Sequence, residues 1–376
     1  MGISVGLNLL HAMPDTTGGW NYLANLIKAL DENDDDYEYF AFVTDDSKHL
    51  LPPKSRIKPV YINIKPISRG QRILYENTIL QYLAHNYSLD CMHWFANTCS
   101  LINVVPSVVT IYDLLVFRND QAFSLIKRFY LLTMMKYTAR SASFLLPISK
   151  FTASDLERVL GVHPNRMIVI PIIIPNEFTK IAESDIERFK EKYHLPEKFW
   201  LYVAHTYKHK NHIRLLEAIK QANLDGLEVW PLVLRGEPND AEFEINNVIQ
   251  KLGLSHKIIR LPQLDYSEMP VLYSAATALI FPSLFEGLGI PILEAMACGC
   301  PVACSDIPPL RESADNAAQY FDPNNLDSIR ESIYRFQTDS LFRNQLSQKG
   351  LERLKEFQQH KVVSDLHLAY QTACIR

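Results

Sequence analysis

The strongest constraint on the fold is an alternation, along nearly the whole chain, of short apolar runs with longer segments of helical periodicity. Short apolar runs are typical of buried strands, and strands that alternate with helices imply βαβ units paired in parallel. Two such series occur, separated by residues 172–196. The sequence therefore predicts an α/β protein built from two doubly wound, Rossmann-like parallel-sheet domains that face each other across a cleft.

The predicted domains and elements follow directly from this pattern. The N-terminal domain is expected at 1–175, the C-terminal domain at 176–357, and a final helix within 358–376 is expected to cross back onto the first domain. The predicted strands are 3–9, 39–43, 58–62, 91–93, 108–111, 144–147 and 168–170, then 200–204, 231–234, 258–261, 278–281 and 302–304. The predicted helices are 21–30, 124–140 and 152–160, then 214–222, 242–252, 269–276, 291–298, 329–337, 341–357 and 359–372. Thr152 or Ser154 is expected to cap the helix at 152–160, and Gly161 to end it.

Composition excludes several classes of protein. The net charge of −4 argues against a nucleic-acid binder, and six cysteines in 376 residues are too few for a disulfide scaffold. No apolar run approaches the ~20 residues of a membrane span, and the first residues do not form a secretory signal. We expect a reduced, cytoplasmic protein without a transmembrane helix.

Basic residues are concentrated in the first domain. Residues 47–150 hold 13 Lys and Arg against 4 Asp and Glu, a local charge of +9. A positive face suits anionic lipid or a phosphate-bearing substrate, although the other domain could balance the charge. The segments 69–83 and 123–140 mix basic with large apolar residues. Two interpretations stay open: helices in peripheral contact with the inner face of a membrane, or helices packed on the core with charged ends in water.

The segment 281–302 carries the clearest chemistry. A strand ends at Phe281, and a loop with Gly287 and Gly289 follows, where the backbone can approach a ligand closely. Pro291 suits the first helical position and Gly299 the position just past the helix end. The backbone N–H groups at the start of this helix have no partner within the helix, and we expect them to bind a phosphate. They belong to Ile290, Ile292 and Leu293.

Two glutamates flank this phosphate site. Glu286 lies in the loop and Glu294 in the first turns of the helix. Carboxylates accept charge-assisted hydrogen bonds from hydroxyl groups. A nucleotide sugar, which carries hydroxyls on both sides of a diphosphate, fits this pattern.

The same segment resembles the donor-site signature of the retaining glycosyltransferases of family 4 (glycosyl transferases group 1), which have the GT-B fold. The family's run is Glu-Gly-Phe-Gly-x-Pro-x-Leu-Glu-Ala-Met-Ala-x-Gly-x-Pro-Val, and only Leu288 departs from it. The likeness extends over nearly the whole chain, through the segments 17–23, 108–114, 146–156, 201–212, 272–276 and 305–312.

The resemblance implies a retaining hexosyltransferase that moves a sugar, with mannose slightly favoured, from a nucleotide diphosphate sugar to a hydroxyl. The acceptor would be a surface polysaccharide, glycolipid or lipid-linked glycan. The resemblance also implies that the N-terminal domain binds this acceptor and that the C-terminal domain binds the nucleotide-sugar donor. It implies no metal and no cofactor besides the donor substrate. By this resemblance Lys210 contacts the donor phosphates, Glu294 the ribose and Glu286 the donor sugar, with Lys210, Glu286 and Asp113 as the catalytic set. The remaining donor-site residues are Gly18, Gly19, His205, Arg235, Gly287, Leu288, Gly289 and Ile290.

Some positions depart from the family pattern. The family's arginine after the first strand of the second domain is His205, and Lys208 or Arg235 would compensate for the lost charge. The family's histidine before Asp113 is Tyr112. These departures keep open a second function, a catalytically inactive GT-B protein that binds a sugar nucleotide or a partner as a scaffold.

The cysteines and histidines of the second domain suggest no metal site. Cys298, Cys300 and Cys304 lack a fourth ligand at a usual spacing, and we expect them to be buried thiols. The cluster of His205, His209 and His212 does not lie on a predicted helix, so a metal spacing is unsupported.

Overall fold

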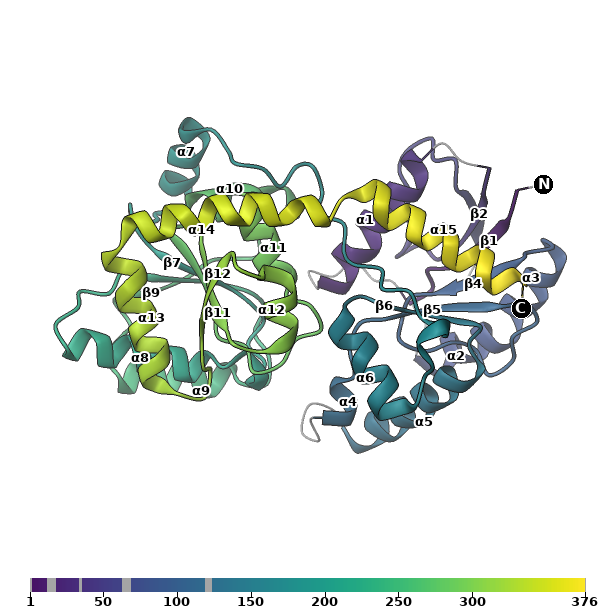
Figure 1. The fold of residues 1–376 in the computed structure, drawn as a ribbon, viewed down its shortest axis with the longest axis horizontal. Coiled ribbons are helices and arrows are strands. Elements are labelled where there is room, and N and C mark those ends of the chain that lie inside the picture. The colour runs from purple at the N-terminus through teal and green to yellow at the C-terminus, as the bar shows by residue number, and fades with distance from the viewer. Residues whose placement is uncertain (1, 12–17, 34–35, 63–68, 119–123, 376) are drawn as a thin grey trace. The chain divides into compact units, whose positions relative to one another are not determined.

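The computed structural model describes residues 2–11, 18–33, 36–62, 69–118 and 124–375 (Figure 1). The chain divides into two compact units. Unit 1 comprises Met1–Ile173 with Phe357–Arg376, and unit 2 comprises Ile174–Glu356. Each unit is a parallel six-stranded sheet with helices packed on it.

Unit 1 has the strand order β3-β2-β1-β4-β5-β6, and all its pairs are parallel. Its strands are β1 (Ser4–Asn8), β2 (Glu38–Val43), β3 (Lys58–Tyr61), β4 (Cys91–Trp94), β5 (Ser107–Ile111) and β6 (Phe144–Pro147). Its helices are α1 (Gly18–Glu32), α2 (Arg69–Asn77), α3 (Ile79–Asn86), α4 (Leu115–Arg118), α5 (Leu125–Ser141), α6 (Lys150–Leu160) and the last helix, α15 (Gln359–Ile375). Helix α15 packs on β4, β5 and β6.

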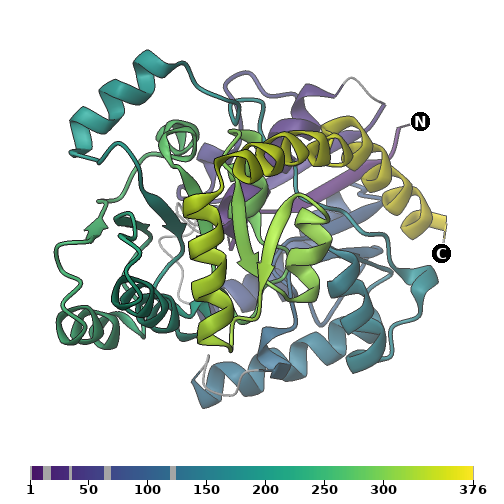
Figure 2. The ribbon, with the colours of Figure 1, turned by 60° about the vertical axis from the view of Figure 1, so that its left-hand side comes forward.

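Unit 2 has the strand order β12-β11-β10-β7-β8-β9, again parallel throughout. Its strands are β7 (Trp200–Val203), β8 (Leu232–Arg235), β9 (Ile258–Arg260), β10 (Ala278–Phe281), β11 (Val302–Ser305) and β12 (Ala318–Phe321). Its helices are α7 (Glu183–Tyr193), α8 (His212–Leu224), α9 (Glu242–Lys251), α10 (Met269–Ala275), α11 (Ile290–Ala297), α12 (Pro308–Ala314), α13 (Leu326–Thr338) and α14 (Ser340–Arg353). In both views the strands of this unit form its centre and the helices lie outside them (Figures 1 and 2).

The apolar runs of the sequence become strands that are covered on both faces. Every residue of β7, β8, β10 and β11 is buried. Parallel sheets have this character because crossover helices cover both faces. This explains why these strands appear in the sequence as continuous apolar runs without alternation.

The strand order reverses once in each sheet, between β1 and β4 in unit 1 and between β7 and β10 in unit 2. Both sheets have the order of the Rossmann fold. In open α/β sheets, ligands bind outside the carboxyl ends of the strands at such a reversal. The loops after these four strands are therefore the places to look for a site.

The structure differs from the predicted elements in several places. Four elements were missed: α4, α7, which lies inside the supposed linker 172–196, and the pair α12 and β12. Helix α7 is mostly charged, with only Ile186 and Phe189 buried, so its apolar periodicity is weak. The segment 69–83 is two helices rather than one, because the backbone at Thr78 departs from helical geometry.

Two local predictions were wrong. Residues 168–170 do not form a strand: the N–H groups of Ile168 and Ile170 bond to β6, but only one bridge, at Met167, forms. The cap of α6 is Ser149, whose hydroxyl accepts from the N–H of Thr152. The predicted end of this helix is confirmed, since Gly161 has φ +65°.

Candidate functional site

An ion pair lies at the strand reversal of unit 2. Lys210 follows β7 and Glu286 follows β10, and Lys210 Nζ is 2.6 Å from Glu286 Oε1. The two side chains are only 16% and 12% exposed. Because β7 and β10 are neighbours, the loops at their carboxyl ends bring together residues 76 positions apart. The structure thus joins two predicted site residues in one place.

Hydrogen bonds between these two loops hold the ion pair in place. The N–H of Leu284 donates to the carbonyl of His209 at 2.8 Å, and Asn211 Nδ2 donates to the carbonyl of Pro282 at 3.1 Å. The buried Tyr202 hydroxyl donates to the carbonyl of Lys210 at 2.5 Å. Burial raises the pKa of Tyr202 well above its usual range, so the hydroxyl stays a donor. The position of the Lys210 backbone is therefore set by both neighbouring strands.

His205 presents a hydrogen-bond donor in place of the expected arginine. Its Nδ1 accepts from the N–H of Glu237 at 2.9 Å. A neutral ring whose Nδ1 accepts must carry its proton on Nε2. Burial, assisted by the charge of Lys210, lowers the pKa of the nearby His209 to about 4, so His209 is neutral near pH 7. The charge of this loop comes from its lysines.

Helix α11 begins at the end of the glycine loop. Gly289 precedes it with φ +96°, and a Cβ at this position would lie 2.5 Å from Leu310 Cδ2. The Ser313 hydroxyl donates to the carbonyl of Leu288 at 2.5 Å, and Leu288 itself is buried. One predicted free N–H is not free, because Ile292 donates to the carbonyl of Gly289 at 3.0 Å. The first turn is tight, and 3₁₀-type bonding of this kind is common at helix ends.

The Glu294 carboxylate is buried between two tyrosines. Its Oε2 accepts from the Tyr273 hydroxyl at 2.7 Å and its Oε1 from the Tyr266 hydroxyl at 3.0 Å. Burial raises the pKa of Glu294, while the two hydroxyls and the nearby Arg235 oppose that rise. Sequence reasoning missed both tyrosines as partners, since nothing in a single sequence links residues 266 and 273 to residue 294.

Arg235 ends β8 and is also buried. Its Nη2 donates to the carbonyl of Leu264 at 3.3 Å, and its Nε has no hydrogen-bond partner among the described residues. The positive charge of Arg235 is one of the influences that lower the pKa of Glu294. Arg235 is the last residue of β8 and Glu294 lies in the helix that follows β10, so both lie toward the carboxyl ends of the parallel strands of unit 2.

The remaining predicted residues belong to unit 1. Gly18 and Gly19 are the first residues of α1, so they open the helix rather than lie in a loop before it, and Thr17 lies outside the described residues. Asp113 Oδ1 accepts from the N–H of Leu115 at 2.8 Å, at the start of α4. The ring of Tyr112 packs edge-on against Tyr22, with ring centroids 5.4 Å apart.

The described part of the chain contains neither a candidate metal site nor a helix that could cross a membrane. No group of three or more His, Cys, Asp or Glu there could hold a metal ion. Cys298, Cys300 and Cys304 are buried thiols, as predicted, and burial raises their pKa values. None of the helices in these ranges combines the length and apolar character needed to cross a membrane.

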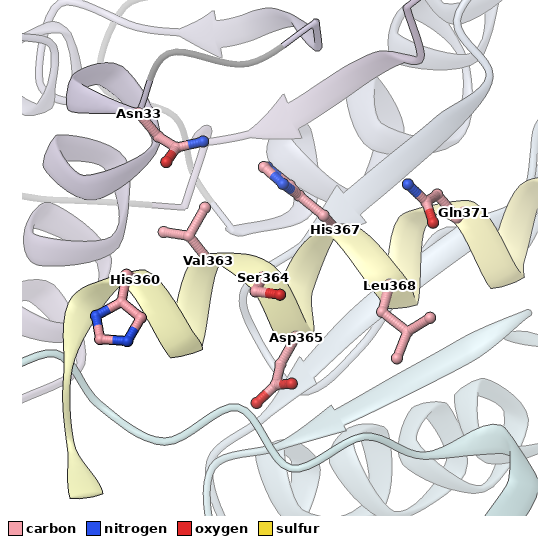
Figure 3. Close-up of a pocket in the computed structure, with 8 residues that line it drawn as sticks. All are labelled: Asn33, His360, Val363, Ser364, Asp365, His367, Leu368 and Gln371. Carbon is pink, nitrogen blue, oxygen red and sulfur yellow. The ribbon is translucent and has the colours of Figure 1, made fainter.

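A separate hollow of about 460 Å³ lies along α15 in unit 1 (Figure 3). It is lined by Asn33, His360, Val363, Ser364, Asp365, His367, Leu368 and Gln371. Asp365 and Leu368 point away from Asn33, and His367 is already bonded to the Tyr39 hydroxyl at 2.8 Å. These contacts serve to anchor α15 on unit 1.

Two Rossmann-like units, the second with the Lys210–Glu286 pair at its strand reversal, have the architecture of the GT-B glycosyltransferases. Residues 183–353 match the family model described as Glycosyl transferases group 1, and residues 16–177 match Glycosyltransferase Family 4. The two ranges together span most of the chain. The chain belongs to these glycosyltransferases, enzymes that transfer a sugar unit, which confirms the predicted fold and class.

Known relatives agree with this membership. The chain is 26% identical to the O-antigen chain mannosyltransferase B of Escherichia coli. The alignment extends over 266 residues and covers 70% of each protein. In fold it resembles the sucrose-phosphate synthase of Thermosynechococcus elongatus, with a TM-score of 0.80, 20% identity, and 98% of each chain covered. It also resembles Anabaena HepE (Alr3699), solved with UDP and glucose, with a TM-score of 0.78, 17% identity, and 98% and 100% covered.

Proposed function

We propose that this enzyme transfers mannose from a nucleotide diphosphate mannose to a hydroxyl of a growing glycan, with retention of the anomeric configuration. The observation that carries the proposal is the Lys210–Glu286 pair at the strand reversal of unit 2. The choice of mannose is supported by the E. coli relative, an O-antigen mannosyltransferase. The nucleotide is expected to be GDP, and the acceptor a surface polysaccharide or a lipid-linked glycan.

Lys210 and Glu286 would bind different parts of the donor, the diphosphate and the sugar. A lysine ammonium has three donors, so Lys210 can keep its bond to Glu286 and still donate to a phosphate oxygen. Glu286 can accept from a sugar hydroxyl with its second oxygen, which would place the sugar next to the leaving diphosphate. The pair thus links the recognition of the sugar to the stabilisation of the leaving group.

Other groups of unit 2 would complete the donor site. The Nε2–H of His205 and the N–H groups at the start of α11 would bind the diphosphate. Glu294, held by Tyr266 and Tyr273, would accept from the ribose hydroxyls, and Arg235 would support the ionised state of this carboxylate. The backbone of Gly287, Leu288, Gly289 and Ile290 would line the site.

Catalysis would be mainly electrostatic. As the bond between sugar and diphosphate breaks, negative charge grows on the phosphate oxygens. A preorganised donor aimed at such a charge is commonly worth about 3–4 kcal/mol. Lys210 and the start of α11 would supply this stabilisation without a metal ion. The departing phosphate would take the acceptor proton, so the mechanism needs no pair of carboxylates at glycosidase spacing.

Helix α5 supports peripheral contact with a membrane. At its start Leu125, Ile126 and Phe129 are 83%, 86% and 74% exposed, and Lys127 and Arg128 lie among them. Its second half packs on the core through Met134 and Met135. Apolar and basic side chains together bind anionic lipid surfaces. We place the enzyme in the cytoplasm at the inner face of the membrane.

Vesicle binding tests the membrane part of the proposal. The wild-type protein should sediment with phosphatidylglycerol vesicles and less with phosphatidylcholine vesicles. Leu125→Ser with Ile126→Ser should abolish the binding and leave sugar transfer to a water-soluble acceptor intact. Equal sedimentation of the wild-type and variant proteins would contradict this role of α5.

Turnover with defined donors tests the transfer itself. GDP-mannose with mannoside acceptors should release GDP and yield an α-linked product by proton NMR, whereas UDP-glucose should react far more slowly. Glu286→Gln should reduce the rate by at least about 100-fold, the usual effect of losing a charge-stabilising contact. Binding of sugar nucleotides without any turnover would favour the non-catalytic scaffold.

A further inference from the structure

The first residues of unit 2 contact both tyrosines that hold Glu294. This entry segment, residues 174–193, consists of a stretch without regular structure followed by α7. Phe178 is only 6% exposed, and its ring centroid lies 5.2 Å from that of Tyr266 and 6.2 Å from that of Tyr273. Both distances are within the range of about 4.5–7 Å at which aromatic rings interact. One buried ring therefore packs on the two residues whose hydroxyls donate to the Glu294 carboxylate.

Helix α7 fixes the turn that carries Tyr266. This turn is the short 3₁₀ helix η4 (Tyr266–Glu268), which directly precedes α10. Its last residue, Glu268, accepts at Oε1 from Lys192 Nζ at 2.7 Å and from the Tyr193 hydroxyl at 3.0 Å. Both donors lie at the end of α7, which packs on α10 (Figure 1). The entry segment thus holds η4 by its side chains as well as by the ring of Phe178.

A further bond ties the entry segment to α10 beside Tyr273. The N–H of Ile181 donates to Ser274 Oγ at 3.2 Å. Ser274 directly follows Tyr273 in α10. The two elements that carry the tyrosines are therefore both fastened to the entry segment, whereas Glu294 itself lies on α11.

The two tyrosine hydroxyls determine how Glu294 can bind a ligand. Each carboxylate oxygen accepts from one tyrosine, Oε1 from Tyr266 and Oε2 from Tyr273. An ionised carboxylate has about four lone-pair sites, so each oxygen can accept one more hydrogen bond. The direction of those remaining sites depends on the direction from which the hydroxyls approach. The same hydroxyls oppose the rise in the pKa of Glu294 that burial causes, and so favour the ionised form.

We propose that Phe178 is a positioning residue of the donor site: by packing on Tyr266 and Tyr273 it directs the Glu294 carboxylate at the ribose hydroxyls of the nucleotide. This inference rests on the proposed function, in which Glu294 binds the ribose. The competing explanation is that Phe178 only fills the core of unit 2, to which it also belongs. Loss of core packing would lower stability alone, whereas loss of positioning would lower the affinity for ribose hydroxyls.

Calorimetric titration with GDP and with its dideoxy analogue, which lacks both ribose hydroxyls, separates the two explanations. The wild-type enzyme should bind GDP at least about tenfold more tightly than dideoxy-GDP, the lower end of what a hydrogen bond to a charged group contributes. In Phe178→Leu this preference should shrink at least about threefold, because GDP binds more weakly while dideoxy-GDP binds as before. Phe336→Leu is the matched control, since this buried ring packs on Trp200 and Phe342 instead. It should keep the wild-type preference.

Steady-state kinetics with GDP-mannose provide a second readout. In Phe178→Leu the KM for GDP-mannose should rise at least about threefold, and kcat should stay near the wild-type value, because the ribose contact is the same before and during the transfer. A purely structural defect would instead reduce the fraction of folded enzyme, which lowers the apparent kcat and leaves KM unchanged.

Three results would overturn the inference. They are an unchanged preference for GDP in Phe178→Leu, an equal loss of preference in Phe336→Leu, and equal binding of GDP and dideoxy-GDP by the wild-type enzyme. Failure of the proposed function would look different: the wild-type protein would bind none of GDP, UDP and GDP-mannose, and the inference would fall with it.

Discussion

Replacement of Gly289 by alanine tests whether the donor loop is built around a close backbone approach. Gly289 has φ +96°, a backbone conformation that strains any L-residue. A left-handed conformation costs an L-residue roughly 1–2 kcal/mol. The new Cβ would also lie 2.5 Å from Leu310 Cδ2, and overpacking of this kind costs about 1–3 kcal/mol. We therefore expect Gly289→Ala to lower the free energy of unfolding by about 2–5 kcal/mol.

A second glycine separates the two contributions. Gly253 has φ +67°, and a Cβ there would meet no atom within 4 Å, so Gly253→Ala carries only the conformational cost. Urea unfolding of both variants should show an excess loss of about 1–3 kcal/mol for Gly289→Ala. Adding Leu310→Ala should recover that excess in a double-mutant cycle. Equal losses in the two glycine variants, or additive effects with Leu310→Ala, would refute the reasoning.

Three further substitutions follow from single contacts. Tyr273→Phe removes the hydroxyl that donates to Glu294 at 2.7 Å. Because hydrogen bonds to charged groups contribute about 1.5–3 kcal/mol, urea unfolding should show a free energy of unfolding lower by that amount. An unchanged free energy would mean that this bond does not stabilise the fold. Burial lowers the pKa of His212 to about 3, below its value of about 6.5 in the unfolded chain, so the wild-type protein should lose stability as the pH falls below 6.5. At pH 4.5 the loss from this residue should be about 3 kcal/mol, and His212→Phe should remove it; parallel pH profiles of the two proteins would contradict this cause. Ser149→Ala removes the cap of α6 and should lower the free energy of unfolding by about 1 kcal/mol, whereas Ser154→Ala, at an exposed helical position, should change it little.

Much of the fold could be predicted because its strands are buried on both faces. The runs that became β7, β8, β10 and β11 are continuous and apolar, so they stand out from their surroundings. Strand β12 was missed because its two middle residues are only half-buried, and its sequence includes a glutamine. Helix α7 was missed because most of its surface faces water, which leaves only Ile186 and Phe189 as an apolar signal.

The sequence indicates candidate site residues, but it does not indicate the contacts that these residues make. Pro291 and Gly299 indicate the two ends of α11 in the sequence, and Gly299 has positive φ in the structure, as does Gly289 just before the helix. The partners of Glu294 depend on how α10 and α11 pack, which is a tertiary property that local spacing cannot reveal. The same holds for the packing of Phe178 on Tyr266 and Tyr273.

Direct titration of GDP-mannose into the enzyme is the most direct test of the central claim, that unit 2 binds a nucleotide diphosphate sugar through the Lys210–Glu286 pair. Lys210→Met should weaken binding at least about 100-fold, since a charge-assisted bond to phosphate is worth about 3 kcal/mol. Lys251→Met, on the exposed end of α9, serves as the control and should bind like the wild type. Equal affinity of the wild-type, Lys210→Met and Lys251→Met proteins would contradict the claim.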